Sequence, residues 1–572
     1  MTYRAPLDDI LFATRLAAGG SAFEAGGLFA DLGDGLLEAT LNGAAKFAEE
    51  RLASCYRDGD RFGAKFEGEA VTTPPGWKAA YADWVKGGWN ALKADPAYGG
   101  FGLPRLLNAA CTEIWQGANA AFAICPLLSQ SAMEALERAA SEELKKTFLG
   151  KIVSGEWSAT MNLTEPQAGS DLALIRAKAE PQPDGSYRLF GQKIFITYGE
   201  HDLTENIVHL VLARLPNAPA GTQGISLFLA PKLLAGAEGR LTRRNDLRCA
   251  GIEHKLGIKG SPTCTMVYGD GDGAVAYLVG ERNKGLATMF AMMNDARLAV
   301  GLQGVGVAER ATQQALAYAR ERRQGRSLQG EAPAPILAHP DVQRMALTMT
   351  ALTHAARAMC YETAVSLDRA RRERDPARAE AAQHRADLLT PVAKAFSTDI
   401  ADEAASLGLQ IFGGVGYIEE TGAAQALRDA RIAPIYEGTN GIQAIDLATR
   451  KLQRTGTALA REIEDMRAIA AEAKLPGAEA LSEAVAEFDR ASRFMREASP
   501  ALALAGATPY LRLFALARGG ALLAKGAAEG DARRAAIARF FAQNLAVAAS
   551  GLAREVIDGG AATLEAEAVF GS

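Results

Sequence analysis

The 572-residue sequence has no closely spaced pair of cysteines. Its six cysteines are scattered without a CxxC motif, which is typical of reduced thiols rather than of a disulfide framework. The six histidines show no HExxH or other paired spacing of metal ligands, so we predict no metal site. A GxSxG sequence is missing too, which removes the commonest arrangement of a serine hydrolase.

An excess of basic residues is also missing. The formal net charge is -5, so we do not expect nucleic acid as a partner. The first residues carry no basic segment before an apolar run, which argues against a secretory signal. The most apolar late stretch, Pro500 to Lys525, is interrupted by Arg512 and Arg518 and falls short of the roughly 20 apolar residues of a spanning helix. We therefore predict a cytoplasmic protein with no transmembrane segment.

The order of patterns along the chain predicts an α+β fold. Near Gly155 helix-forming sequence gives way to short segments rich in β-branched and aromatic residues. Helical periodicity returns after Gly285, and Pro391 is expected to start or kink one of the later helices. We expect an N-terminal extension, an N-terminal helical domain, a central β-barrel-like domain, a helical bundle domain and an extra C-terminal helical domain, at residues 1–38, 39–157, 158–283, 284–454 and 455–572.

Two glycine motifs do not fit the sites that they suggest. GVGVAE, which begins at Gly304, lacks the third glycine of a dinucleotide fingerprint and follows helical rather than strand sequence. DGDG, which begins at Asp270, lacks the remaining ligands of a calcium loop, and a solvated β-turn explains it better. Neither motif is therefore interpreted as a binding site.

Two segments of the β region place small residues beside a few polar ones. MNLTEPQAGSD contains a Gly/Pro loop whose amides suit a planar ring or a thioester, and its Thr164 and Ser170 supply hydroxyls. In GQKIFITYGE, alternation puts Phe195 and Thr197 on one face of a strand, where a ring and a hydroxyl suit a flavin. Taken alone, an ordinary turn explains the first segment better, and an ordinary strand end explains the second equally well.

Two further segments lie in the helical region that follows. NDAR, Asn294 to Arg297, precedes the arginine-rich ARERRQGRS; such arginines suit phosphates or carboxylates, although most arginine-rich helix ends are simply solvated. LQIFGGVGY precedes RDARIAPIYEGTNGIQ, where Glu437 is followed by Gly438, a neighbour with no side chain to block a ligand.

Together, in this order and spacing, the four segments resemble the acyl-CoA dehydrogenase family. TEPQAGSD, FIT, QIFGGVG and IYEGT correspond to that family's TEPxAGSD, aromatic-Ile-Thr, QxxGGxG and IYEGT motifs. The resemblance covers the region from Ala39 to Arg450. The N-terminal YRAPLDDILF, the insertion around Leu233 to Ile252 and the C-terminal extension look like the subgroup that includes 3-methylmercaptopropionyl-CoA dehydrogenase.

The resemblance implies FAD as the cofactor, bound between the β domain and the helical bundle domain. Its adenosine and pyrophosphate would be contacted from a neighbouring subunit by Arg322 and by Gln410 through Gly414, which implies a homodimer. Cofactor contacts are expected from Met161, Leu163, Thr164, Gly169, Ser170, Phe195, Ile196, Thr197, Arg322, Gln410, Gly413, Gly414, Thr439, Asn440 and Gly441. The acyl-CoA substrate is expected to meet Ser170, Asn294, Arg297 and Gly438.

The resemblance also implies a reaction. Glu437 would take the C2 proton of an acyl-CoA thioester while hydride passes from C3 to flavin N5, giving the trans-2-enoyl-CoA, with electrons passing to an electron-transferring flavoprotein. The C2 proton is too weakly acidic for a free carboxylate at pH 7, so the site must stabilise the enolate, and burial should raise the pKa of Glu437. Some family members carry the base just before the arginine of NDAR, where Ala296 cannot serve here.

Departures from the family pattern and rival functions bear on this interpretation. Phe195 stands where many members have Trp, and Gln167 where many have Gly, so the flavin pocket is expected to differ in detail. An acyl-CoA oxidase shares the flavin and the base but gives electrons to oxygen; the motif spelling and the N-terminal segment favour the dehydrogenase. A catalytically silent flavoprotein is disfavoured by the intact Glu437 and flavin motifs. The C-terminal extension is expected to cover the acyl pocket or to seal the dimer.

Overall fold

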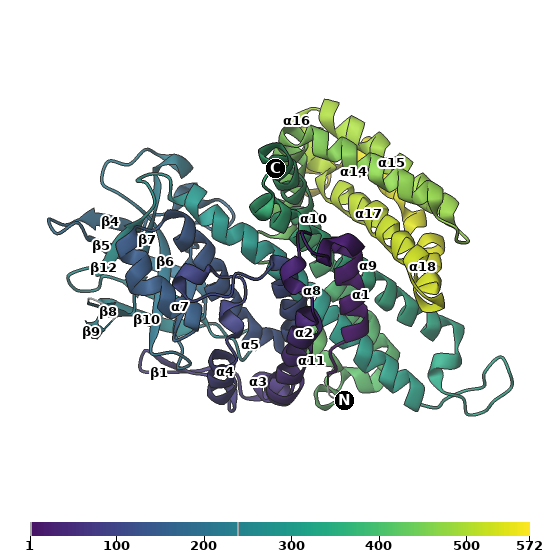
Figure 1. Ribbon diagram of the computed structural model, residues 1–572, viewed down its shortest axis with the longest axis horizontal. Coiled ribbons are helices and arrows are strands. Elements are labelled where there is room, and N and C mark those ends of the chain that lie inside the picture. Colours follow the sequence, from purple (N-terminus) through teal and green to yellow (C-terminus); the bar gives the residue numbers. More distant parts are fainter. Residues whose placement is uncertain (1–2, 237–239, 572) are drawn as a thin grey trace. The chain divides into compact units, whose positions relative to one another are not determined.

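The structure, a computed structural model shown in Figure 1, describes residues 3–236 and 240–571. The chain forms two compact units, each built from separate stretches of sequence. The β unit comprises Phe47–Pro104 and Asn119–Ala296, and the helical unit comprises Met1–Lys46, Arg105–Ala118 and Arg297–Ser572. Three helices contain residues of both units: α2 (Leu36–Phe47), α5 (Arg105–Ala139) and α8 (Gly285–Glu321).

The β unit is built around an eight-stranded sheet in which the order of neighbours is β10-β11-β5-β12-β7-β6-β3, and β4 pairs with both β5 and β6. Because β4 joins β5 to β6, the strands β5, β12, β7, β6 and β4 close into a ring, which confirms the β-barrel-like domain. The strands are β3 (Trp157–Asn162), β4 (Lys178–Pro181), β5 (Tyr187–Thr197), β6 (Asn206–Arg214), β7 (Ile225–Pro231), β10 (Leu247–Ile252), β11 (Thr263–Tyr268) and β12 (Ala274–Val279).

Strand β6 lies inside the β unit and is covered on both faces. Val208 and Leu210 enter one hydrophobic cluster, which also contains Trp157 and side chains of α5, whereas Val211 and Ala213 enter a second cluster with Tyr187. Successive residues of a strand point to opposite faces, so a strand buried on both sides is apolar throughout. This explains why NIVHLVLAR shows no alternation of apolar and polar residues.

The helix-forming sequence at the start of the β unit is interrupted by a β-hairpin that we did not predict. Strands β1 (Lys65–Glu67) and β2 (Ala70–Thr72) pair in antiparallel fashion. The two residues between them, Gly68 and Glu69, both have positive φ, as a tight two-residue hairpin turn requires. The helices here are α3 (Tyr56–Phe62), α4 (Trp77–Lys86), α6 (Glu142–Leu144) and α7 (Gly150–Ser154), and a second hairpin pairs β8 (Leu233–Ala235) with β9 (Leu241–Arg244).

The helical unit contains α1 and the long helices of the second half of the chain, together with the predicted C-terminal extension. In the extension, α17 packs against α9, α10, α14, α15, α18 and α19. The helices of this unit are α1 (Leu7–Ala18), α9 (Pro340–Arg372), α10 (Pro376–Phe412), α11 (Ala423–Ala430), α12 (Asn440–Asp446), α13 (Leu452–Arg454), α14 (Gly456–Glu472), α15 (Ala478–Glu497), α16 (Pro500–Ala505), α17 (Ala507–Glu529), α18 (Ala532–Asn544), α19 (Ala549–Asp558), α20 (Gly560–Leu564) and α21 (Glu567–Phe570).

One of our two alternatives, that a helix begins at Pro391, is wrong. Helix α10 begins at Pro376 and continues through Pro391 to Phe412. The Asp375 side chain accepts hydrogen bonds from the first free backbone N–H groups, and Pro376 stands in the first turn, where its missing N–H costs nothing. The sequence Asp-Pro is therefore a stronger start signal than the isolated proline inside the helix.

The rejected glycine motif GVGVAE lies inside α8, in agreement with its helical context. A Cβ atom on Gly304 would lie 2.3 Å from the carbonyl oxygen of Ser397, and one on Gly306 would lie 2.5 Å from the backbone nitrogen of Gly117. Both glycines therefore allow α8 to approach α10 and α5 closely. Their role is close packing of helices.

The apolar stretch from Pro500 to Lys525 forms the short helix α16, in which only Ala503 is buried, and most of α17, whose residues are mainly buried. Its Arg518 is 2% exposed and donates to Glu362 of α9 at 2.6 Å, which explains a charge inside this apolar run. By length and composition alone, residues Ala532–Asp558 could cross a membrane. This is weak evidence for a membrane span, because the segment is divided where α18 ends at Asn544 and α19 begins at Ala549. Both helices pack against α17.

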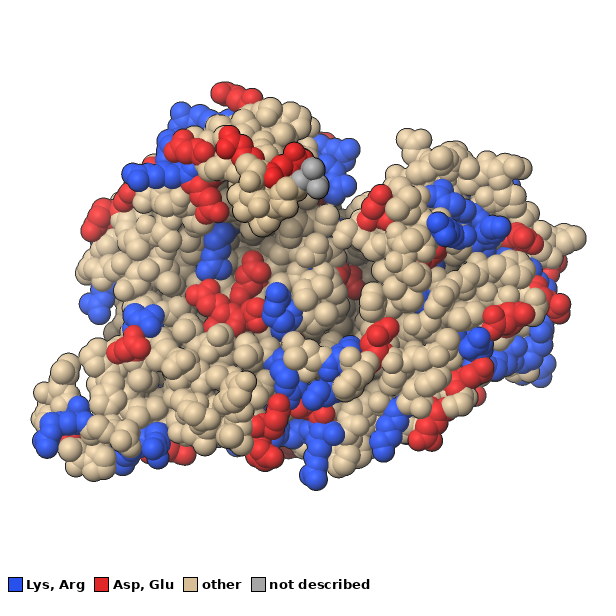
Figure 2. All heavy atoms as spheres, turned by 180° about the vertical axis from the view of Figure 1, so that it is seen from behind, with Lys and Arg blue, Asp and Glu red and all other residues tan. Residues whose placement is uncertain are grey.

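Acidic and basic side chains are interspersed on the face of the molecule shown in Figure 2. Helix α15 also carries both signs of charge, because Asp489 pairs with Arg493 at 2.8 Å and Glu487 pairs with Arg490 at 2.6 Å. Exposed pairs one helical turn apart contribute little to stability. This pattern is consistent with the small formal net charge of -5.

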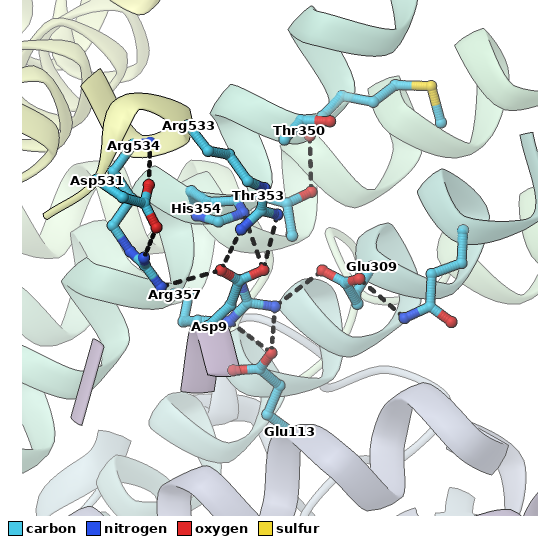
Figure 3. Close-up of polar contacts among 12 residues, drawn as sticks. Asp9, Glu113, Glu309, Thr350, Thr353, His354, Arg357, Asp531, Arg533 and Arg534 are labelled. Atoms are coloured by element: carbon cyan, nitrogen blue, oxygen red, sulfur yellow. Dashed lines mark hydrogen bonds and ion pairs between the residues drawn. The ribbon is translucent and has the colours of Figure 1, made fainter. Parts of the chain in front are cut away.

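A buried carboxylate links the N-terminal helix α1 to other helices of the helical unit. Figure 3 shows Asp9 held by Arg533, whose two terminal nitrogens donate to the two carboxylate oxygens at 2.6 and 2.9 Å. The neighbouring Arg534 lies over the ring of Phe12 at 3.8 Å. Because α1 also packs against α9, this contact joins the first helix of the chain to both α9 and the extension.

We expect Asp9 to make the stability of the protein depend on pH in the acidic range. Burial disfavours the charged carboxylate, but the hydrogen bonds from Arg533 and the positive charges of His354, Arg357 and Arg533 together outweigh it and lower the pKa of Asp9 to about 2. A depressed pKa in the folded state contributes stability that is present above the unfolded pKa of about 3.9 and lost as pH falls through about 2, here roughly 2 kcal/mol. Thermal unfolding midpoints between about pH 5 and 2 should therefore fall less steeply in Asp9→Asn, which is already less stable at pH 5. The exposed neighbour Asp8→Asn is the control; parallel curves for wild type and Asp9→Asn would contradict the prediction.

Candidate active site

The segment that carries Glu437 is a tight loop between α11 and α12. Its ends are closed by the backbone N–H of Asn440, which donates to the carbonyl oxygen of Pro434 at 2.9 Å. Glu437 has a φ of 55° and Gly438 a φ of 80°, so two successive residues adopt the left-handed region. This conformation is costly for a residue with a side chain and is found most often where function requires it. The positive φ therefore makes Glu437 a candidate functional residue.

The Glu437 carboxylate has two cations in its vicinity. Burial raises the pKa of Glu437 to about 7, and the positive charges of Lys394 and Arg297 partly oppose this rise. Within the described part of the chain, the carboxylate makes neither a hydrogen bond nor an ion pair, and the backbone N–H of Glu437 has no acceptor. A carboxyl group with a pKa close to the working pH, and not engaged elsewhere, can act as a general base.

Gly438 is required by its surroundings. A Cβ atom at this position would lie 2.5 Å from Nε2 of Gln443 and 3.5 Å from Nη2 of Arg297. Arg297 is buried and pairs with Asp446 of α12 at 3.7 Å. The structure therefore brings together three residues predicted from the sequence, Glu437, Gly438 and Arg297. Asn294, also predicted, is half-buried one turn earlier in α8 and belongs to the β unit.

Within the β unit, the two predicted motifs meet through hydrogen bonds. The backbone N–H of Ile194 donates to the carbonyl oxygen of Thr164 at 2.9 Å. Lys193 is fully buried and donates to the carbonyl oxygen of Leu163 at 2.9 Å and to the Glu165 carboxylate at 2.8 Å. The loop of TEPQAGSD is thereby fixed on the strand that carries FIT.

Phe195 and Thr197 both lie away from the core that Ile196 enters. Phe195 is 58% exposed, whereas Ile196 is 2% exposed. The alternation of side chains along the strand predicted that Phe195 and Thr197 share a face, but the strand is not regular. Phe195 has a φ of 59°, and a bulge shifts the register of β5 against β11 between Cys264 and Met266. The bulge turns an aromatic ring outward at the end of the strand.

The unused polar atoms around Phe195 fit a flavin. Among the residues described, no group accepts from or donates to the hydroxyls of Thr164 and Thr197. Gly169 and Ser170 are exposed, and a Cβ atom on Gly169 would meet nothing within 4 Å. An exposed ring with free hydroxyls beside a loop of small residues suits a flat ligand that has an apolar face and a polar edge. Half-buried Met161, in β3, and half-buried Leu163, directly after this strand, precede the loop.

The residues predicted to meet the adenosine and pyrophosphate lie on the surface of the helical unit. Tyr318 stacks on Phe412 with 4.3 Å between ring centres, which brings the ends of α8 and α10 together. Arg322 follows the end of α8, and Gln410 lies in the last turn of α10. Arg322, Gln410, Gly413 and Gly414 are all exposed, and a Cβ atom on either glycine would meet nothing within 4 Å.

The three residues predicted to contact the flavin after Glu437 differ in their surroundings. The side chain of Asn440 donates to the Ala395 carbonyl oxygen at 3.1 Å and to the Asp399 carboxylate at 2.7 Å, so it is engaged inside the protein. Thr439 is half-buried and Gly441 is exposed at the start of α12. Thr439 and Gly441 are therefore better placed than the Asn440 side chain to meet a ligand.

Comparison with known proteins covers nearly the whole chain. The sequence matches the N-terminal, middle and C-terminal domains of acyl-CoA dehydrogenase at residues 37–156, 160–270 and 283–452, and an "acetyl-CoA dehydrogenase C-terminal like" domain at residues 459–567. The chain belongs to the acyl-CoA dehydrogenase family. It is an FAD-dependent oxidoreductase that acts on an acyl-CoA, as the motifs predicted.

Several relatives in the acyl-CoA dehydrogenase family are similar over most of their length. The 3-methylmercaptopropionyl-CoA dehydrogenase of Ruegeria pomeroyi is 47% identical over 563 residues, which is 96% of this chain and 95% of the relative. A butyryl-CoA dehydrogenase of Syntrophomonas wolfei is 37% identical, with 73% of this chain and 70% of the relative covered. Among solved structures, an acyl-CoA dehydrogenase from Bacillus anthracis has a TM-score of 0.72 at 21% identity, with 94% and 91% covered, and shows the same fold.

Two buried lysines near the acyl-CoA dehydrogenase motifs were missed by sequence reasoning. Lys193 supports the TEPQAGSD loop, and Lys394 lies beside the segment of Glu437. The only signal in the sequence is a single lysine within an apolar helix or strand segment, as in LLTPVAKAF. A lysine in such a position must have acceptors, but the sequence does not name them.

Proposed function

We propose that this protein removes hydrogen from C2 and C3 of an acyl-CoA thioester and forms the trans-2-enoyl-CoA, with Glu437 as the base. The observation that carries this proposal is the Glu437 carboxylate itself, which is unpaired in the described structure, has a pKa of about 7 and stands in a left-handed loop beside Gly438. A base of this pKa is ionised in about half of the molecules at neutral pH and can accept a proton from a weak carbon acid once the enolate is stabilised.

The backbone around Glu437 supports the stabilisation of that enolate. The N–H of Glu437 has no acceptor among the residues described, so it is available to donate to the thioester oxygen as negative charge develops there. Gly438 presents no side chain to the substrate. FAD, when bound, supplies the acceptor for the hydride that leaves C3. The half-buried Glu437 then holds the C2 proton.

The binding of cofactor and substrate is proposed from the motifs and from the surroundings of their residues. Thr164, Phe195 and Thr197 would meet the flavin ring, together with Met161, Leu163, Gly169, Ser170, Ile196, Thr439, Asn440 and Gly441. The acyl-CoA would meet Ser170, Asn294, Arg297 and Gly438. The unused hydroxyls of Thr164 and Thr197 support the first assignment. The position of Arg297, whose Nη2 would lie 3.5 Å from a Cβ atom on Gly438, supports the second.

We further propose that the protein is a homodimer in which Arg322, Gln410, Gly413 and Gly414 contact the FAD of the partner. Next to these residues, Val415, Tyr417 and Ile418 are 47%, 84% and 50% exposed. Large apolar side chains grouped on a surface are typical of an interface.

The similarity to the relatives supports proposals on the electron acceptor, the substrate and the location in the cell. An electron-transferring flavoprotein is the proposed acceptor, within fatty-acid β-oxidation in the cytoplasm. The similarity to the Ruegeria pomeroyi enzyme supports 3-methylmercaptopropionyl-CoA as a substrate beside short saturated acyl-CoAs. A reducing compartment suits the six cysteines, which are buried and form no disulfide: Cys55, Cys111, Cys125, Cys249, Cys264 and Cys360.

A single titration tests this function. The flavin absorbance at about 450 nm is followed without oxygen while saturated acyl-CoAs of increasing length and 3-methylmercaptopropionyl-CoA are added. Oxygen is then admitted. We expect rapid bleaching that persists in oxygen and is reversed by an electron-transferring flavoprotein. Fast recolouring with formation of peroxide would instead identify an acyl-CoA oxidase, and no bleaching with any thioester would contradict the proposal.

A further inference from the structure

Lys394 lies beneath the loop that carries Glu437 and is fully buried in the middle of α10. Its ammonium donates to the carbonyl oxygen of Ala433 at 2.9 Å and to Oδ1 of Asn440 at 2.8 Å. Ala433 comes four residues before Glu437, and Asn440 comes three residues after it. One side chain therefore holds both ends of the segment that presents the carboxylate.

The Asn440 end of this segment is fixed from several sides. The amide nitrogen of Asn440 donates to the Ala395 carbonyl oxygen, to the Thr398 hydroxyl at 3.0 Å and to the Asp399 carboxylate. All three partners belong to the same stretch of α10 as Lys394. Left-handed residues such as Glu437 and Gly438 persist only when the surrounding structure holds them. The contacts of Lys394 and Asn440 provide this support.

The charges around the pair come from three helices. Glu437 faces Lys394 of α10 and Arg297 of α8. Lys394 faces Glu437, Asp399 of its own helix and Arg297. Arg297 is paired with Asp446 of α12, which also accepts from Arg450 at 2.6 Å, and the neighbouring Tyr436 donates to Gln303 at 2.5 Å.

Burial acts in opposite directions on the two groups. It lowers the pKa of Lys394 to about 7, against the negative charges of Glu437 and Asp399. It raises the pKa of Glu437, against the positive charges of Lys394 and Arg297. Each group therefore favours the charged form of the other, in a setting that screens charges poorly.

We propose that Lys394 is a positioning residue for the reaction, which holds both ends of the Glu437 loop in place and whose positive charge favours the ionised form of the carboxylate. This inference rests on the proposed role of Glu437 as the base. Lys394 does not touch the substrate; it acts through the carboxylate. Because of this, its loss should alter the pH at which the enzyme works more than the binding of the acyl-CoA.

Three variants of the FAD-loaded enzyme separate the two contributions. Lys394→Met removes both the charge and the hydrogen bonds, Lys394→Gln keeps hydrogen-bond donors without the charge, and Lys394→Arg keeps the charge. The exposed Lys474→Met is the control. For each variant, kcat and KM are measured against pH, and FAD content and the thermal unfolding midpoint are recorded alongside.

We expect the acidic limb of the pH profile of kcat/KM to move upward by about one pH unit in Lys394→Met and Lys394→Gln, because the charge that favours ionised Glu437 is gone. Turnover at pH 7 should fall about fivefold and recover by about pH 9, with KM little changed. Lys394→Arg and the control should keep the wild-type limb. If Lys394→Met is too unstable to bind FAD, the acidic limb of Lys394→Gln alone tests the proposal.

An unmoved acidic limb in a folded, FAD-loaded Lys394→Gln would overturn the proposal and leave Lys394 with a structural role only. That outcome is distinct from a failure of the proposed function. If Glu437→Gln retained turnover, the base itself would be misassigned, whatever the Lys394 variants showed. If Glu437→Gln is inactive and the limb of the Lys394 variants does not move, only the inference on Lys394 fails.

Discussion

Replacing Glu437 by glutamine is expected to lower kcat by about a thousandfold, because loss of a general base typically costs a hundredfold to ten-thousandfold. Glutamine keeps the size and the left-handed backbone of the loop but cannot accept the C2 proton. FAD binding should be unchanged, since the carboxylate makes no contact with the described residues that shape the flavin motifs. The measurement is single-turnover flavin bleaching without oxygen, at saturating acyl-CoA and at several pH values.

The control for this variant is Glu180→Gln, which changes an exposed glutamate of β4 and should leave the rate within about twofold. Wild type should show an acidic limb with a pKa near 7, the value that burial gives Glu437. The residual rate of Glu437→Gln should show no such limb. Wild-type bleaching by Glu437→Gln would show that another group takes the proton and would remove the main support of the proposed function.

The residues proposed to bind ligands could be picked out from the sequence because their motifs are local. Glu437 and Gly438 are adjacent, and the loop of Thr164 and the strand of Phe195 each lie within a short segment. The order of helical and β sequence likewise predicted the α+β fold. A period of two or 3.6 residues is a property of a single segment, so it can be read before any contact is known.

The supporting residues could not be predicted, because their partners are distant in sequence. Lys193 reaches Leu163, 30 positions away, and Lys394 reaches Asn440, 46 positions away. The bulge at Phe195 depends on pairing with β11, and the continuation of α10 through Pro391 depends on its packing against α9. Such features are decided by tertiary contacts, which override local propensity.

Arg357 is expected to contribute more to stability than the other charged groups discussed so far. It is 1% exposed, and donates to Glu113 at 2.7 Å and to Glu309 at 2.9 Å (Figure 3). Glu113 also accepts from the hydroxyl of Tyr361 at 2.8 Å. Through these contacts α9 is joined to α5 and α8 within the helical unit.

Changing Arg357 to methionine should lower the free energy of unfolding by about 3 to 5 kcal/mol, because it leaves a buried carboxylate without its cation. Burial raises the pKa of Glu113 and Arg357 opposes that rise, so without Arg357 the carboxyl group should take up a proton in the folded state. The double variant Arg357→Met, Glu113→Gln should therefore recover part of the loss, since it removes the uncompensated charge.

The matched control is Arg344→Met on the same helix. Arg344 pairs with Asp341 at 2.8 Å, but its side chain is 54% exposed, so the change should cost at most about 1 kcal/mol. Urea unfolding at pH 7 measures all three variants against the wild type. Equal losses in Arg357→Met and Arg344→Met would show that burial does not decide the value of the ion pair, and a double variant less stable than Arg357→Met would show that Glu113 is held by Tyr361 rather than by charge.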